Sequence, residues 1–218
     1  MYTNVNLAAP LGALALLGAA VLLFLAAVLL THSLVVRKPR RAKIALLLMC
    51  GITAIYLGVM LVFSFASQEK LLAKGEEKHF CELDCHLAYS VAKTAQSKSF
   101  GNGSNQLTAR GQFVVITIKT RFDETTIASQ RGDGELYPNG RAITLTDERG
   151  NRYAPVAQAG TSITTPLRPA EFYTTDVLFD LPADAKPTTL LMHEDAWETR
   201  LVIGHENSLL HKKTRFQV

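Results

Sequence analysis

The stretch Leu7–Leu30 (LAAPLGALALLGAAVLLFLAAVLL) decides the fold of this chain, together with a second apolar run, Ile44–Phe65 (IALLLMCGITAIYLGVMLVFSF). Neither run contains a charged residue, and a helix of roughly 20 apolar residues crosses about 30 Å of hydrocarbon. A core helix of a soluble domain would show a polar stripe at helical spacing, and neither run has one. The sequence therefore predicts a transmembrane hairpin over residues 1–67, with spans at about 7–31 and 43–66.

The short loop between the two spans, residues 32–43, is strongly basic. Short positive loops stay in the cytoplasm, so both chain ends are expected outside. No cation precedes the first run, whereas a cleaved signal peptide begins with positive charge. We therefore expect an integral protein of a bacterial inner membrane, N-out and C-out, with its soluble part in the periplasm. The cations that set this topology are Arg37, Lys38, Arg40, Arg41 and Lys43.

The charge distribution argues against two classes of function. The net charge is +4, and five cations lie in the inner loop, so the outer part is near neutral and a nucleic acid partner is not expected. Neither span holds an ionisable side chain at mid-depth, which transporters and proton channels usually need. The expected partners are the lipid bilayer and other membrane protein subunits.

The remainder of the chain divides into a connecting segment and a β-rich domain. Residues 68–85 are predicted to form a juxtamembrane stalk and a cysteine loop, and residues 86–218 an external β-sandwich. Short β-branched and aromatic runs separated by Gly, Pro and Asp turns are typical of such sandwiches. We expect Ser97–Gly111 to be a polar loop. The predicted strands are Tyr89–Ala95, Gln112–Arg121, Arg141–Thr146, Arg152–Pro155, Glu171–Leu181, Thr188–His193, Arg200–Gly204 and Thr214–Val218.

Three of these segments resemble an immunoglobulin-like bacterial extracytoplasmic domain of unknown function. They are the strand Gln112–Arg121, the hairpin motif D-x-x-G-x-x-Y within Leu145–Tyr153, and the V-x-F-x-x-P strand within Leu167–Pro182. The resemblance covers residues 86–195 and implies an all-β immunoglobulin-like sandwich on a two-helix membrane anchor. Its motifs are turns and core positions, so it implies no catalytic residue and supplies no function.

The most suggestive chemistry lies in the string HFCELDCH, which holds His79, Cys81, Cys85 and His86 just beyond the second span. Three alternatives are open for it. The first is a disulfide, because the outer compartment is oxidising and two cysteines four residues apart can meet across a turn. The second is a metal site, because two thiolates with one or two imidazoles suit copper or zinc.

The third alternative is covalent attachment of haem c. The usual attachment motif is C-x-x-C-H, and the segment Cys81–His86 has one residue more between its cysteines. His86 would then be an axial ligand of the iron. Met192, His193 and His205 are further candidate ligands from distant parts of the chain.

No sequence motif in the chain indicates an enzyme. There is no nucleophile elbow of the type G-x-S-x-G, no phosphate loop and no dinucleotide fingerprint. We therefore expect a non-enzymatic accessory or scaffold subunit without a cofactor, whose β-sandwich binds or stabilises a larger membrane protein complex. The alternative is a periplasmic redox or metal-handling protein that uses CELDCH to hold copper or haem c.

Overall fold

The computed structural model describes residues 2–5, 9–81, 85–103, 106–126 and 132–218. These form two compact units. The β unit comprises Met1–Asn4, Glu69–Asp195 and Lys213–Val218, and the helical unit comprises Val5–Gln68 and Ala196–Lys212. The chain thus passes between the units four times, after residues 4, 68, 195 and 212.

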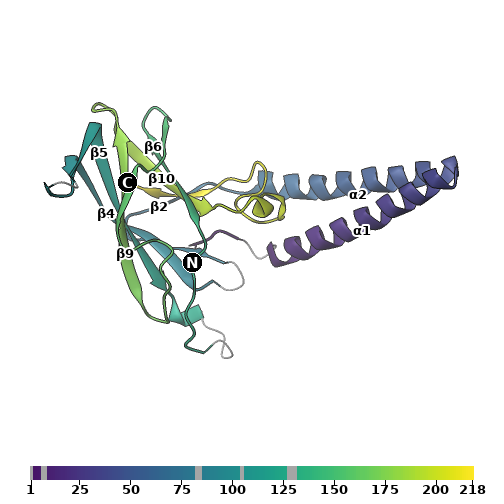
Figure 1. Cartoon of the computed structure of the whole chain (residues 1–218), viewed down its shortest axis with the longest axis horizontal. Coiled ribbons are helices and arrows are strands. Elements are labelled where there is room, and N and C mark those ends of the chain that lie inside the picture. The colour runs from purple at the N-terminus through teal and green to yellow at the C-terminus, as the bar shows by residue number, and fades with distance from the viewer. Residues whose placement is uncertain (1, 6–8, 82–84, 104–105, 127–131) are drawn as a thin grey trace. The chain divides into compact units, whose positions relative to one another are not determined.

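The helical unit contains two long helices that run antiparallel (Figure 1). α1 spans Ala9–Val35 and α2 spans Pro39–Ala66, lengths of 27 and 28 residues. At about 1.5 Å per residue each helix is about 40 Å long, more than the hydrocarbon thickness of a bilayer. Both helices are long and apolar enough to cross a membrane. Pro39 begins α2 where its missing N–H costs no hydrogen bond.

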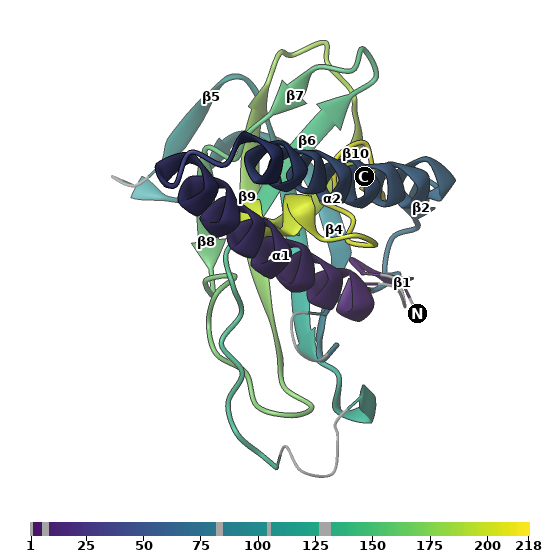
Figure 2. The same cartoon turned by 90° about the vertical axis from the view of Figure 1, so that its right-hand side faces the viewer.

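The β unit contains two sheets (Figures 1 and 2). Sheet 1 has the order β1-β3-β4-β5-β9-β8, and sheet 2 has the order β2-β11-β10-β6-β7. The bounds in sheet 1 are β1 Tyr2–Thr3, β3 Lys78–Phe80, β4 Leu87–Phe100, β5 Leu107–Phe122, β9 Phe172–Leu181 and β8 Ala157–Gly160. Those in sheet 2 are β2 Lys70–Leu72, β11 Thr214–Gln217, β10 Pro187–Glu194, β6 Arg141–Asp147 and β7 Arg152–Tyr153.

The two sheets pack against each other as a β-sandwich. Antiparallel pairing joins β4, β5, β9 and β8 in the first sheet and β11, β10 and β6 in the second. Alternate residues of both sheets point into one shared core, for example Ile116 of β5 and Leu190 of β10. The predicted fold class, two apolar helices followed by an all-β sandwich, is confirmed.

The predicted hairpin motif is also confirmed, and Asp147 organises it. Its carboxylate accepts the backbone N–H groups of Arg149 at 2.9 Å and Asn151 at 2.8 Å, and the hydroxyl of Tyr153 at 2.8 Å. One carboxylate thereby satisfies donors that a tight turn would otherwise leave unpaired. Gly150 has a φ of 81°, a conformation that glycine adopts without steric cost.

Three predicted boundaries are wrong. Residues 68–85 do not form a separate stalk, because they supply β2 to sheet 2 and β3 to sheet 1. Ser97–Gly111 is mostly strand, because β4 and β5 continue to Phe100 and from Leu107. Arg200–Gly204 is not a strand, because Trp197–Leu201 forms a 3-10 helix within the helical unit. In the first case pairing with sequence-distant β11 overrides the local pattern, and in the second β4 and β5 extend as one hairpin.

Candidate functional site

The candidate disulfide or metal-binding residues predicted from the sequence lie around the turn between β3 and β4. His79 is the middle residue of β3, Cys81 follows that strand, and Cys85 and His86 precede β4. The two strands pair antiparallel, so the turn brings these four residues to one end of the strand pair. The turn's central residues, 82–84, lie outside the described residues.

Cys81 and Cys85 form a disulfide, with the sulfur atoms 1.99 Å apart and the Cα atoms 4.0 Å apart. A sulfur in a disulfide is not a thiolate, which is the form that binds copper, zinc or a haem vinyl group. Copper or haem c at this turn would therefore require the bond to be reduced first. No cluster of three metal-ligating side chains is found among the described residues.

The two imidazoles beside the disulfide are buried. His79 is 5% exposed, and its Nε2 lies 2.8 Å from a carboxylate oxygen of Asp123. His86 is 1% exposed, and its ring stacks on Phe122 with the centroids 5.1 Å apart. Both rings therefore contribute to packing at the end of sheet 1, and the His79 ring also contributes a polar contact.

Asp123 is the centre of a charged cluster that the sequence did not reveal. The residue follows β5, is 6% exposed, and accepts hydrogen bonds from the backbone N–H of Thr125 at 3.1 Å and its hydroxyl at 2.7 Å. Arg121 lies 3.4 Å from Asp123 and donates two hydrogen bonds to Glu77, at 2.9 and 2.7 Å. These contacts form one continuous network, which we call the charged cluster; its members are His79, Asp123, Arg121 and Glu77. Such two-bond contacts fix geometry as well as charge.

The N-terminal residues are tied to the same turn. Asn4 is 1% exposed; its backbone N–H donates to the carbonyl of His79 at 3.1 Å, and its side-chain oxygen accepts the N–H of Cys81 at 2.7 Å. The Asn4 amide nitrogen donates to Glu194 of β10 at 2.5 Å. Asn4 therefore joins sheet 1, sheet 2 and the cysteine turn. No sequence signal marks it, because all its partners are distant in the chain.

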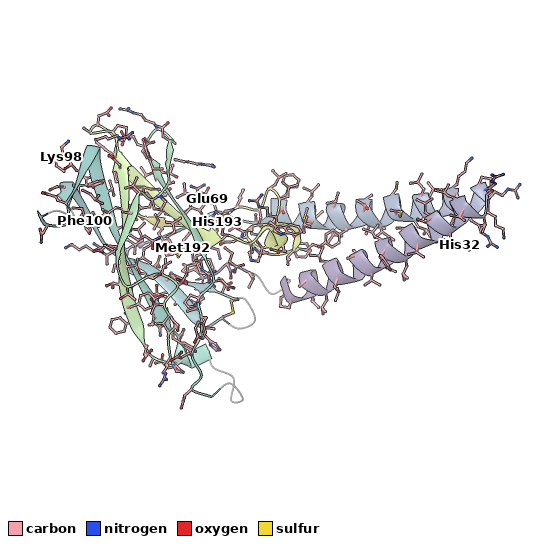
Figure 3. The ribbon with its side chains drawn as sticks, in the orientation of Figure 1. His32, Glu69, Lys98, Phe100, Met192 and His193 are labelled. Carbon is pink, nitrogen blue, oxygen red and sulfur yellow. A yellow bond between two sulfur atoms is a disulfide. The ribbon has the colours of Figure 1, made fainter. Side chains whose placement is uncertain are left out.

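The other candidate ligands do not gather at the cysteine turn. Met192 is 0% exposed and packs in the core of the sandwich. His193 is its neighbour on β10, and its Nδ1 lies 2.8 Å from the carbonyl of Glu194 (Figure 3). His205 belongs to the helical unit, where its Nδ1 accepts the N–H of Asn207 at 3.0 Å.

Comparisons with known proteins supply a fold likeness and no family. No family model and no curated protein matches the chain. A solved structure described as an uncharacterized β-sandwich protein from Clostridium difficile 630 is 12% identical, covering 70% of this chain and 95% of that one. Its TM-score is 0.42, so the sandwich assignment here rests on the strand order and shared core instead.

Loss of the disulfide should cost stability. Closing so short a loop restricts the unfolded chain by about 2 kcal/mol in the chain-entropy model. We expect the double variant Cys81→Ser/Cys85→Ser to lose about that much free energy of unfolding, measured by denaturation of the full chain in mild detergent.

The control for this prediction is a reductant. It should weaken the parent protein by the same amount and leave the double variant unchanged. Both proteins should carry Cys50→Ser, so that Cys81 and Cys85 are the two remaining cysteines of the parent protein. Labelling of Cys81 and Cys85 before reduction would contradict the disulfide.

Acid should weaken the β unit through its buried carboxylates. Burial raises the pKa of Asp123, but hydrogen bonds from Thr125 and His79 outweigh this effect and hold the pKa well below its ordinary value. At Asp147 burial is likewise outweighed by hydrogen bonds from Asn151 and Tyr153, and the pKa falls to about 2. A lowered folded-state pKa stabilises the fold above the unfolded-state value, and this contribution disappears as the pH falls.

We therefore expect stability to be nearly constant down to about pH 4.5, since unfolded Asp titrates near 3.9, and to fall between about pH 4 and 2. Thermal unfolding at constant ionic strength measures the profile. A loss of stability centred near pH 6 would instead implicate histidine and contradict this assignment.

Proposed function

We propose that this chain is an integral membrane accessory subunit whose β unit docks on a larger membrane protein complex outside the cytoplasm. The β unit would belong with the immunoglobulin-like extracytoplasmic domains that it resembles. The basic residues between α1 and α2 support a cytoplasmic hairpin turn, with both chain ends on the opposite side of the membrane. The disulfide is in keeping with an oxidising compartment such as the periplasm.

Short connections support the anchoring role. α2 ends at Ala66 and β2 begins at Lys70, so the three residues between them reach at most about 11 Å. The chain also crosses between the units at three other points. A domain connected in this way remains attached to its membrane anchor at several points of the chain.

The observation that carries the docking role is the exposed residue Val156, at the edge of a small apolar cluster on the outward face of sheet 1. Phe113, Val115 and Leu178 point away from the sandwich core, because their strand neighbours point into it. An outward sheet face in a monomeric sandwich is normally polar. Val156, beside this cluster through Ala157, is 56% exposed. The cluster itself is covered, because Phe113, Val115 and Leu178 are 3%, 8% and 0% exposed, and Val156 extends it to the surface, where an exposed apolar side chain can enter a protein contact.

The docking proposal is tested by native electrophoresis of host membranes extracted in mild detergent. The parent chain should migrate within an assembly larger than its own 23.9 kDa plus bound detergent. Val156→Glu should release it as a small species. Leu71→Glu is the matched control, because Leu71 is also 56% exposed but lies on β2 of sheet 2. A single small species for the parent chain would contradict the proposal.

The orientation is tested separately by proteolysis. Protease added to spheroplasts, from the periplasmic side, should remove the β unit. Removal only from the cytoplasmic side, in inverted vesicles, would contradict the orientation.

The redox or metal-handling alternative predicts a different outcome at the cysteine turn. The purified chain would then bind stoichiometric copper or show haem absorption, and Cys81→Ser/Cys85→Ser would abolish either signal. A colourless, metal-free protein that retains the Cys81–Cys85 disulfide would support the accessory role over this alternative.

A further inference from the structure

Residues 196–212 leave the β unit between β10 and β11 and join the helical unit, and we call this segment the excursion. It opens with the 3-10 helix Trp197–Leu201 and continues in a series of turns. Figures 1 and 2 draw it in yellow beside the helices. Neither the charged cluster nor the docking proposal accounts for its structure.

The excursion is held by contacts with both helices. The hydroxyl of Tyr56 in α2 donates to the carbonyl of Leu201 at 2.6 Å. Gly12 in α1 lies so close to Ile203 that an added Cβ would be 2.1 Å from the Ile203 carbonyl oxygen. Ser67, just after α2, accepts the N–H of Lys212 at 2.8 Å.

These contacts place part of the excursion beside the apolar spans. Tyr56 lies nine residues before Phe65, the last residue of the second apolar run, which is about 14 Å along a helix. Gly12 lies within the first apolar run. Since Leu201 and Ile203 contact these two residues, the excursion lies alongside the spans and not only beyond their ends.

Part of the excursion has a polarity that is the reverse of that of a water-exposed loop. Four consecutive polar side chains are buried: His205, Glu206, Asn207 and Ser208 are 4%, 3%, 9% and 3% exposed. Four large apolar side chains face outward: Trp197, Leu201, Leu209 and Leu210 are 67%, 40%, 57% and 60% exposed, while Ile203 is buried. The charged side chains of Glu198, Arg200 and Lys212 are exposed and would have to reach the headgroup level. Water would favour the opposite arrangement, whereas hydrocarbon favours this one.

The backbone of the excursion forms several of the internal hydrogen bonds that a lipid environment requires, since polar groups there must be satisfied within the protein. Successive N–H groups of Val202, His205, Ser208 and His211 donate to carbonyls three residues earlier. Side chains supply further bonds, including Asn207 to Thr199 at 2.9 Å and the Ser208 hydroxyl to the carbonyl of Val202.

We propose that the excursion is embedded in the outer leaflet of the bilayer, with Trp197, Leu201, Leu209 and Leu210 in contact with lipid. The occupant of this apolar surface is lipid because the surface is continuous with the two spans through Tyr56 and Gly12. Tryptophan is favoured where acyl chains meet headgroups, since its ring is apolar and its N–H is polar. The chain then contacts the membrane through a third element besides its two helices. This inference rests on the membrane placement of α1 and α2 and is independent of any docking partner.

The test uses the fluorescence of Trp197, which is the single tryptophan of the chain. The full chain is reconstituted into three preparations of phosphatidylcholine vesicles. In the first, the acyl chains carry bromine near the headgroup (upper-chain bromine); in the second, they carry it near the bilayer centre; in the third, they carry none. We expect blue-shifted emission that upper-chain bromine quenches most, and little quenching by aqueous iodide. Quenching by iodide with no effect of bromine would overturn the proposal. Shielding from both would also overturn it, because a partner or second copy would then cover the surface.

Two variants sharpen the test. The control is Trp197→Phe/Tyr137→Trp, because Tyr137 is also 67% exposed but belongs to the β unit; its new tryptophan should respond to iodide and not to bromine. The variant Leu209→Asp/Leu210→Asn should release the excursion, shifting Trp197 emission to the red with loss of bromine quenching. Leu210 has a φ of 61°, which asparagine tolerates.

Flotation of the same vesicles separates this inference from the membrane placement itself. Failure of the chain to float with the lipid would contradict the placement of α1 and α2. Flotation without bromine quenching of Trp197 would contradict the excursion alone.

Discussion

Replacing Lys78 by alanine should reduce the free energy of unfolding by about 3–5 kcal/mol, the largest effect that we expect from one substitution. Lys78 lies on β3 and is 0% exposed. Its ammonium donates to the carbonyl of Met192 on β10 at 2.8 Å and approaches that of Thr214 on β11 at 3.5 Å. It also lies 4.7 Å from the ring centre of Phe80.

The reason for this large effect is that Lys78 connects the two sheets from inside the sandwich. β3 belongs to sheet 1, whereas β10 and β11 belong to sheet 2. Alanine would leave a cavity and remove a charged donor from buried carbonyls, and these two costs add.

Lys78→Met separates the two costs. Methionine fills a similar volume without a charge, and replacing buried charge by apolar volume is often tolerated. We expect it to lose less than half as much stability as Lys78→Ala. Denaturant titration of the full chain in mild detergent, followed by near-ultraviolet circular dichroism, measures both variants. A change below about 1 kcal/mol for Lys78→Ala would contradict a buried role.

Replacing Asp123 by alanine should cost about 3 kcal/mol, because it leaves partly buried cationic and polar groups without their acceptor. Arg121 would keep Glu77 and, at 3.6 Å, Glu124 as partners, and the His79 ring would lose its contact at 2.8 Å. The Arg121 side chain is 24% exposed, so water compensates part of the loss and the value lies at the low end of the range for buried pairs.

The pH dependence of Asp123→Asn distinguishes charge from packing. Asparagine keeps the shape but does not titrate, so the variant should lose less stability than the parent between about pH 4 and 2. Some acid sensitivity should remain from Asp147, whose pKa is about 2. Parallel pH profiles for the two proteins would show that Asp123 does not act through its charge.

Several features of the β unit could be predicted because they depend on neighbouring residues. The alternating run Gln112–Arg121 lies within β5, and the turn of Asp147 is closed by residues two to six positions away. The disulfide was one of three alternatives for the cysteine turn, because spacing alone does not distinguish oxidised sulfurs from thiolate ligands.

The charged cluster and Lys78 could not be predicted from the same signals. Glu77, Lys78 and His79 form a polar run of the kind found in solvated segments. Their burial depends on partners more than 40 residues away, such as Arg121, Asp123 and Met192. A buried charge is stable only where such partners are already in place, and no local pattern encodes that condition.

The sequence by itself determined the two apolar helices, the basic turn between them and the succession of β-strands, because length, charge and alternation act over a few residues. Only the tertiary structure decided that residues on both sides of the helices join the same sandwich, and that the excursion buries His205–Ser208 while exposing Trp197, Leu209 and Leu210. The physical reason is that strand pairing and burial are set by contacts between residues far apart in the chain.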